Sequence, residues 1–158
     1  MSLAEGERVV KFAELAPQDQ QLLEYAAAEL PYSYHPYGRG EGFSVGAAVL
    51  TVDGTFHANS NHEAKIQRTC AERSTLSKAH GAHDGNKCVA MAVIGQFGDG
   101  SPTEEVAYPC PSCRELIAEF ANRSGVRGKF RLIMADTNME KVVVTTIGVL
   151  LPHAYDYP

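Results

Sequence analysis

The sequence predicts an α/β fold in which one sheet is covered by helices on both faces. Helical periodicity and short β-prone runs alternate along the chain in the order α-β-β-α-β-α-β-β, and this alternation favours a sheet with helices packed against it. The chain has 158 residues, which is enough for one domain to bury a core of its own. No repeat or linker divides it, so we expect a single domain over residues 1–158.

The first helix is expected over residues 17–30, where apolar residues recur with helical spacing. Pro17 suits the first helical position, and Pro31 ends the run. Residues 31–42 are rich in Tyr, Pro and Gly and predict a loop. The aromatic side chains of this loop could line a pocket or pack on the surface.

A hairpin follows the loop. Residues 43–51 form a short apolar run, and Asp53-Gly54 separates it from a second β-prone run over residues 55–58. Three small residues in the middle of the first strand indicate that another element packs closely against it: Gly46, Ala47 and Ala48.

The second helix is expected over residues 69–79, where Thr69 and Glu72 match the spacing of a capping box. The remaining elements follow from apolar runs and one further amphipathic stripe. They are a buried strand over residues 89–94, a helix over 110–121, strands over 130–135 and 141–145, and a short helical turn before Pro152.

The net charge of −5 and the sequence pI of about 5.6 disfavour a nucleic-acid partner, because phosphate contacts usually need a basic face. No apolar run reaches the roughly 20 residues that span a bilayer, and the N-terminal residues do not resemble a signal peptide. We therefore expect a cytoplasmic protein without a membrane partner. In that compartment the four cysteines are expected to be metal ligands or free thiols.

The residues that indicate chemistry are Cys70-Ala71-Glu72 and, 40 positions after Cys70, Cys110-x-x-Cys113. Two thiolates three residues apart at the start of a helix can bind one ion, and the helix dipole favours their ionised form. Zinc prefers four ligands in a tetrahedron, and a catalytic site leaves the fourth position to water. Cys70 is the natural third ligand. Glu72 would then reach the water and act as a general acid and base.

With these motifs in view, the sequence resembles the cytidine deaminase family in its three-cysteine form. The matching pieces keep the family's order across about residues 17–155. They are Phe43-Ser44-Val45-Gly46-Ala47-Ala48, Asn59, Cys70-Ala71-Glu72-Arg73, Pro109-Cys110-x-x-Cys113-Arg114 and Leu150-Leu151-Pro152-x-Ala154-Tyr155.

The resemblance implies a three-layer α/β/α sandwich around a five-stranded mixed sheet, a Zn²⁺ cofactor and a homotetramer in which neighbours complete each other's sites. It also implies hydrolytic deamination, in which activated water attacks C4 of a cytosine nucleoside and ammonia leaves. Arg73 is expected to offset the charge of three thiolates through hydrogen bonds to cysteine sulfur. The substrate contacts that the resemblance implies come from Phe43, Asn59, Asn61, Ala71 and Tyr155.

Some positions depart from the family: the loop before Phe43 is longer, Tyr108 and Pro111 replace small residues, and the sugar-binding motif differs at position 61. The family's sugar-binding motif is usually Asn-x-Glu, whereas the corresponding residues here are Asn59-Ser60-Asn61. A neutral acceptor in place of a charged one costs about 1–3 kcal/mol of recognition. Blasticidin S deaminases are close relatives that also lack this Glu. The first hypothesis is therefore a cytidine or deoxycytidine deaminase, and the alternative is a deaminase of blasticidin S or a related nucleoside antibiotic.

Simpler interpretations remain open for each residue. The cysteines could form a closed structural site with Cys88 or a histidine as the fourth ligand. Glu72 could only cap its helix, Arg73 could be a solvated charge, and Asn59 could serve a turn. Phe43 and Tyr155 could pack in the core. The chain could also be an inactive homologue that only binds nucleosides or partners, or an editing enzyme for RNA or DNA.

Overall fold

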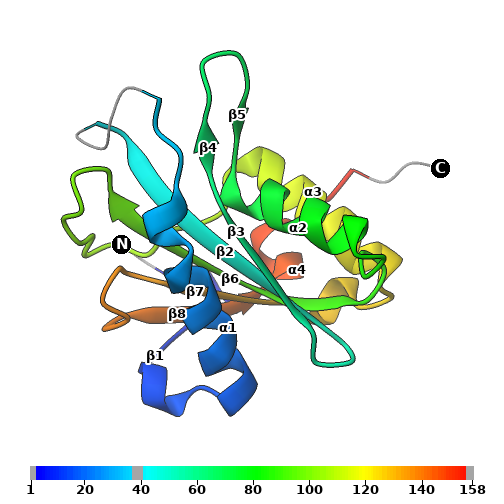
Figure 1. The fold of residues 1–158 in the computed structure, drawn as a ribbon. Coiled ribbons are helices and arrows are strands. Elements are labelled where there is room, and N and C mark those ends of the chain that lie inside the picture. Colours follow the sequence, from blue (N-terminus) through cyan, green and yellow to red (C-terminus); the bar gives the residue numbers. More distant parts are fainter. Residues whose placement is uncertain (1–2, 37–40, 156–158) are drawn as a thin grey trace.

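Figure 1 shows the computed structural model, which describes residues 3–36 and 41–155. Of the loop expected over residues 31–42, residues 37–40 therefore lie outside the described part. The first helix ends at Ala28, two residues before the expected end, and a 3₁₀ turn at Leu30–Tyr32 follows after Glu29.

The centre of the fold is a six-stranded mixed sheet with the strand order β1-β8-β7-β6-β2-β3. β6 and β7 run parallel, and all other neighbours are antiparallel. The strands are β1 (Arg8–Val10), β2 (Phe43–Thr51), β3 (Phe56–Ser60), β6 (Cys88–Phe97), β7 (Arg131–Ala135) and β8 (Val142–Thr146).

We expected five strands, and the structure corrects this number to six. The additional strand is β1, which pairs antiparallel with β8. The three residues of β1 are too few to show a period-2 pattern, so the sequence gives no local signal for this strand. Its pairing depends on the edge that β8 presents, which is a property of the assembled sheet.

Helices cover both faces of the sheet, as the alternation predicted. In Figure 1, α1 (Pro17–Ala28) lies on one side, and α2 (Ala71–Gly81) and α3 (Pro111–Arg123) lie on the other. Two clusters of buried apolar side chains fill the two interfaces, one between the sheet and α1 and the other between the sheet and the pair α2 and α3. The short α4 (Ile147–Leu150) follows β8, where a helical turn was expected.

The close approach predicted from the small residues of β2 lies at Gly46. A Cβ atom at this position would come within 1.9 Å of the carbonyl oxygen of Ala26 in α1. No side chain fits in that space, so glycine allows α1 to pack directly on the strand.

The start of α2 differs from the sequence prediction in a way that matters for the site. Thr69 belongs to a short strand, β5 (Arg68–Thr69), which pairs with β4 (His62–Glu63) in a hairpin that projects at the top of Figure 1. Cys70 is the N-cap of α2, and no side chain caps this helix end. The predicted capping box between Thr69 and Glu72 is therefore wrong, and the carboxyl group of Glu72 is free for other partners.

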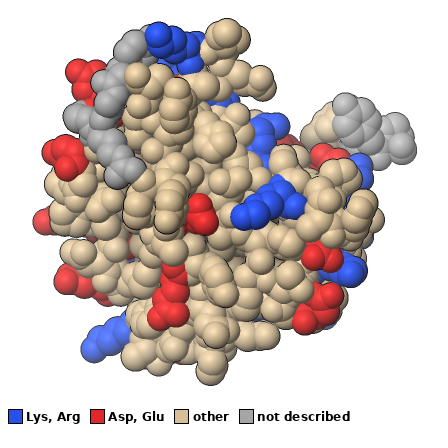
Figure 2. Space-filling model, viewed as in Figure 1, with Lys and Arg blue, Asp and Glu red and all other residues tan. Residues whose placement is uncertain are grey.

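Within the described residues, no helix is long and apolar enough to cross a membrane. Figure 2 shows acidic and basic side chains interspersed over the face in view, with no extended basic surface among its coloured residues.

Candidate metal centre and active site

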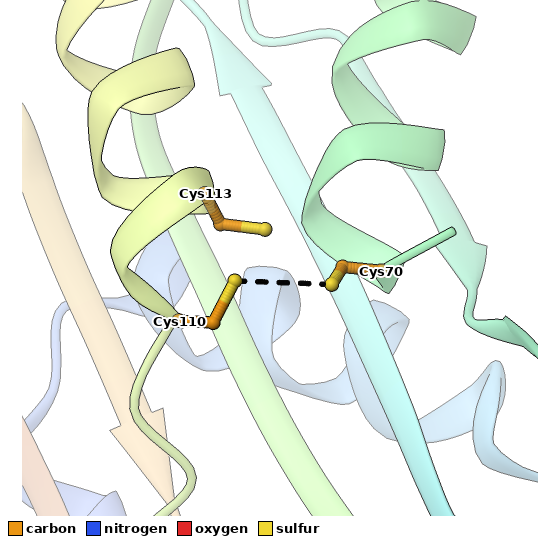
Figure 3. A group of neighbouring side chains, drawn as sticks. All are labelled: Cys70, Cys110 and Cys113. Atoms are coloured by element: carbon orange, nitrogen blue, oxygen red, sulfur yellow. Dashed lines mark hydrogen bonds between the residues drawn. The ribbon is translucent and has the colours of Figure 1, made fainter. Parts of the chain in front are cut away.

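Three cysteines from two helix starts meet at one point (Figure 3). Cys70 is the N-cap of α2, Cys110 is the N-cap of α3, and Cys113 lies in the first turn of α3. Their sulfur atoms all lie within 4.8 Å of one another, and the Sγ atoms of Cys70 and Cys110 are 3.9 Å apart. The sequence prediction of one shared site for these three thiols agrees with this geometry.

The three thiols fit a zinc ion. Zinc–sulfur bonds of about 2.3 Å in a tetrahedron place two sulfur atoms about 3.8 Å apart, close to the 3.9 Å between Cys70 and Cys110. Three thiolates that leave one position open are typical of a catalytic rather than a structural zinc site.

The three thiols differ in how easily they lose a proton. Burial raises the pKa of Cys70 and of Cys113. Burial also acts on Cys110, but hydrogen bonds from the backbone N–H and thiol of Cys113 and from the thiol of Cys70 outweigh it and lower the pKa of Cys110. Cys110 is therefore the thiol that ionises first, and a bound cation would favour the thiolate form of all three.

Among the described residues, no fourth His, Cys, Asp or Glu joins this group. Cys88, the alternative fourth ligand, is buried at the start of β6, and its thiol donates to the carbonyl oxygen of Asp84. The described residues thus do not supply the fourth protein ligand of a closed structural site.

Glu72 lies in the first turn of α2, beside the metal group but not part of it. Its side chain is only 5% exposed, and burial raises the pKa of its carboxyl group. A hydrogen bond with the side chain of Cys113 opposes this shift and places the carboxyl group next to the thiols. The carboxyl group is thus positioned to exchange a proton with a water molecule at the open position.

Arg73 is exposed on α2, and its Nη2 donates to Oγ of Ser112 at 3.0 Å. Ser112 stands between Cys110 and Cys113, so the guanidinium group spans the two helix starts that carry the thiols. The expected hydrogen bond from Arg73 to a cysteine sulfur stays a prediction, and the position of Ser112 keeps the positive charge close to the thiols.

Phe43 is not a plain core residue, since it is 36% exposed. Its ring packs edge to face with Phe97, with 5.9 Å between ring centroids. A Cβ atom added at Gly95 would come within 2.5 Å of the ring, so the absence of a side chain there makes room for Phe43. The ring forms one wall of a cavity of about 550 Å³.

The remaining candidates for substrate contacts lie in different environments. Asn59 is half-buried in β3, and its Oδ1 accepts from the backbone N–H of Ser60 at 2.9 Å. Ala71 is fully buried in the core at the start of α2. Asn61 is only 3% exposed, and it uses its whole side-chain amide within the protein. Contact with substrate stays a prediction for these three residues.

Tyr155 is 70% exposed, which excludes core packing for its side chain within this chain. Its backbone N–H donates to Oε2 of Glu115 in α3 at 3.1 Å. Nη1 of Arg114, on the same helix, donates to the carbonyl oxygen of Leu150 at 3.4 Å. Helix α3 therefore holds the C-terminal segment beside the metal group.

Sequence reasoning missed the polar residues that line the cavity beside Phe43: His35, Glu41, Glu63, Lys65 and Arg68. They come from the segment before β2 and from the β4–β5 hairpin. Only the nearness of Arg68 to Cys70 in the sequence hinted at such a role, because the hairpin is too short to be predicted from its pattern.

Comparison with known proteins agrees with this geometry. Residues 16–128 match the family model described as the cytidine and deoxycytidylate deaminase zinc-binding region. A cytidine deaminase of Sporosarcina psychrophila is 36% identical over 127 residues, which cover 78% of this chain and 80% of that protein. A blasticidin-S deaminase of Bacillus cereus is 28% identical over 149 residues, which cover 92% of this chain and 98% of that protein.

Among solved structures, the cytidine deaminase of Burkholderia pseudomallei superposes with a TM-score of 0.71 at 30% sequence identity. The match covers 85% of this chain and 97% of that chain.

Proposed function

The chain belongs to the cytidine and deoxycytidylate deaminase family, and from this premise we propose that it removes the amino group of a cytosine nucleoside by zinc-dependent hydrolysis. Cytidine and deoxycytidine are the substrates that we propose first. Uridine or deoxyuridine and ammonia are the products.

One observation carries the proposal. A buried carboxyl group, that of Glu72, lies beside three thiols that fit zinc and leave one position open. A site with only a structural role has no need for an acid whose burial raises its pKa. General acid–base catalysis by Glu72 on a water molecule at the metal explains why the thiols and the carboxyl group lie together.

Cys70, Cys110 and Cys113 would hold the ion. When bound, zinc supplies a Lewis acid that lowers the pKa of a coordinated water to about 7. Glu72 accepts one proton from the attacking water at a carboxylate oxygen and passes it to N3 of the base as the C4–O bond forms. It then takes the second proton from the new hydroxyl group and gives it to the departing amino nitrogen. The C4–N bond breaks, ammonia leaves, C4 becomes a carbonyl, and the carboxylate ends the cycle as it began.

Two further features of the site support the reaction, namely the burial of Glu72 and the positive charge of Arg73. Because Glu72 is almost fully buried, bulk water does not compete for its proton. The positive charge of Arg73, fixed on Ser112, lies beside the thiols and offsets part of the negative charge that three thiolates carry.

A side-by-side ultraviolet assay tests the proposal. The purified, zinc-loaded protein is incubated with cytidine, deoxycytidine and blasticidin S, and loss of the cytosine chromophore is followed. Turnover of cytidine or deoxycytidine is the expected result. Failure with all three substrates, at one zinc per chain, would refute the proposed reaction.

A deaminase of blasticidin S is the second candidate. It is favoured by the match to the Bacillus cereus blasticidin-S deaminase along almost the whole of both chains, and by the neutral Asn61 at the position expected to bind sugar. Turnover of blasticidin S alone in the same assay would decide for this candidate.

We further propose that residues 1–158 act as one catalytic domain, in the cytoplasm and as a homotetramer. Both apolar clusters pack on the same sheet, which supports one domain. All four cysteines are free thiols, which is typical of a reducing compartment. Analytical ultracentrifugation at assay concentration tests the tetramer.

A further inference from the structure

The side chain of Asn61 is saturated by hydrogen bonds within the protein. Its Oδ1 accepts from Oγ of Ser33 at 2.5 Å and from the backbone N–H of Val45 at 2.8 Å. Its Nδ2 donates to the carbonyl oxygen of Phe43 at 2.9 Å and to Oε1 of Glu63 at 3.0 Å. A primary amide has two acceptor sites and two donor hydrogens, and all four are used. Asn61 has nothing left to offer a ligand.

These bonds give Asn61 a structural task. Phe43 and Val45 belong to β2, whose pairing with β3 ends opposite Gly46. Beyond Gly46, the side-chain amide of Asn61 takes the place of a neighbouring strand. It accepts a hydrogen bond from the N–H of Val45 and donates one to the carbonyl oxygen of Phe43. It thereby fixes the backbone that carries the ring of Phe43.

Glu63, by contrast, has acceptor capacity to spare. Its backbone N–H donates to the carbonyl oxygen of Tyr34 at 2.8 Å, so its main chain is fixed. Oε1 accepts one bond from Asn61, and Oε2 lies 3.4 Å from Nε of Arg68, whose side chain is 82% exposed. A carboxylate offers about four acceptor positions, and an exposed ion pair of this kind holds its partner weakly.

The carboxylate of Glu63 and the ring of Phe43 line the same cavity of about 550 Å³, within the range of small-molecule sites. Arg68 in the wall of this cavity is two residues from Cys70 in the chain, and α2, whose N-cap is Cys70, packs on β2, the strand that begins at Phe43. A carboxylate acceptor and an aromatic ring in one cavity suit a ligand that carries both hydroxyl donors and C–H groups, as a sugar does.

We propose that Glu63, positioned by Asn61, is the residue that recognises the sugar hydroxyls of the nucleoside. This proposal rests on the deaminase function proposed above and adds to it the group that selects for the sugar. Glu63 accepts hydrogen bonds from the hydroxyls and displaces Arg68 toward solvent, while Asn61 acts only by holding Glu63 and Phe43 in place.

The test compares two substrates with the same base, cytidine and 2′,3′-dideoxycytidine, which lacks the 2′- and 3′-hydroxyls and keeps the 5′-hydroxyl. Glu63→Gln should lower kcat/KM for cytidine about 10- to 100-fold, the usual effect of losing a charged hydrogen-bond partner. The same variant should change kcat/KM for dideoxycytidine less than about threefold. An equal loss on both substrates, or no loss on cytidine, would overturn the proposal.

Two further variants separate Glu63 from its neighbours. Asn61→Asp keeps an acceptor but removes the donors to Phe43 and Glu63 and adds a charge beside Glu63, so it should lower the melting temperature and the kcat/KM for cytidine. Improved turnover of cytidine by this variant would show that position 61 contacts the sugar directly. A hydroxyl-dependent loss in Glu41→Gln, with none in Glu63→Gln, would assign recognition to the other acid of the cavity.

Equilibrium binding separates failure of this inference from failure of the proposed function. Both nucleosides are titrated against the zinc-loaded protein with and without Glu63→Gln. If the protein binds cytidine more tightly than dideoxycytidine and Glu63→Gln removes the difference, the inference holds even without turnover. If turnover is normal and the difference persists in Glu63→Gln, the inference is wrong and the function stands.

Discussion

Replacing Glu72 with Gln removes the acid–base group and leaves the shape of the site unchanged. The amide has the volume of the carboxyl group, so the nearly fully buried side chain still fills its space. Volume-conserving changes usually alter the free energy of unfolding by less than about 1.5 kcal/mol. The three thiols are untouched, so one zinc per chain should remain.

The loss of activity follows from the burial of the site. An amide can neither accept the proton of the water nor return one to the leaving nitrogen. Because the Glu72 side chain is only 5% exposed, a base from bulk solvent replaces it poorly. Positioned acid–base catalysis contributes about 10²- to 10⁴-fold, and one group serves both transfers here. We therefore expect kcat to fall about 10⁴-fold, equivalent to about 5.4 kcal/mol.

The assay is the ultraviolet decrease with cytidine at saturating concentration, with zinc measured by mass spectrometry on the same sample. Glu24→Gln, the same change at an exposed position of α1 on the opposite face of the sheet, is the control and should match the unmodified protein. If Glu72→Gln keeps more than about a tenth of kcat with a full complement of zinc, the role assigned to Glu72 is wrong.

Three further changes test other parts of the structure. Cys113→Ala should reduce zinc well below one per chain and abolish turnover, whereas Cys88→Ala should keep full zinc because Cys88 packs in the core and is not part of the metal group; equal zinc loss in both would contradict the assigned ligand set. Gly46→Ala should cost at least about 2 kcal/mol of stability in chemical denaturation, because its Cβ would lie 1.9 Å from the carbonyl oxygen of Ala26; an unchanged midpoint would refute the close approach of α1. Gly95→Ala should push the ring of Phe43 aside and raise the KM for cytidine about tenfold, or 1.4 kcal/mol, with zinc content unchanged; an unchanged KM would remove Phe43 from the binding site.

The parts of the fold with strong local patterns could be predicted from the sequence. The helix at Pro17–Ala28 has a regular apolar stripe between two prolines, and the strand at Phe43–Thr51 was predicted with its observed bounds. The three thiols could be assigned to one ion because each stands at a helix start, where the spacing of the motif limits the possible geometries.

Other features depend on partners distant in the sequence. The three residues of β1 form a strand only because β8 offers an open edge. The β4–β5 hairpin moves Thr69 out of the helix, so the capping box could not form although its sequence pattern was present.

Asn61 shows the same limit at the level of a single side chain. Its position in the motif indicates sugar binding, but its partners Ser33 and Val45 become visible only when the segment before β2 and the end of β3 lie side by side. Tertiary contacts, not residue type, determine which polar group near Phe43 still has capacity for a ligand.

The central claim is that zinc on the three thiols makes this chain a cytidine deaminase. The most direct test removes the metal with a chelator, adds zinc back in steps, and measures ammonia released from cytidine together with the metal bound. We predict that activity is absent without metal, rises in proportion to bound zinc and reaches a plateau at one zinc per chain. Ammonia release without metal, or none at one zinc per chain, would contradict the account.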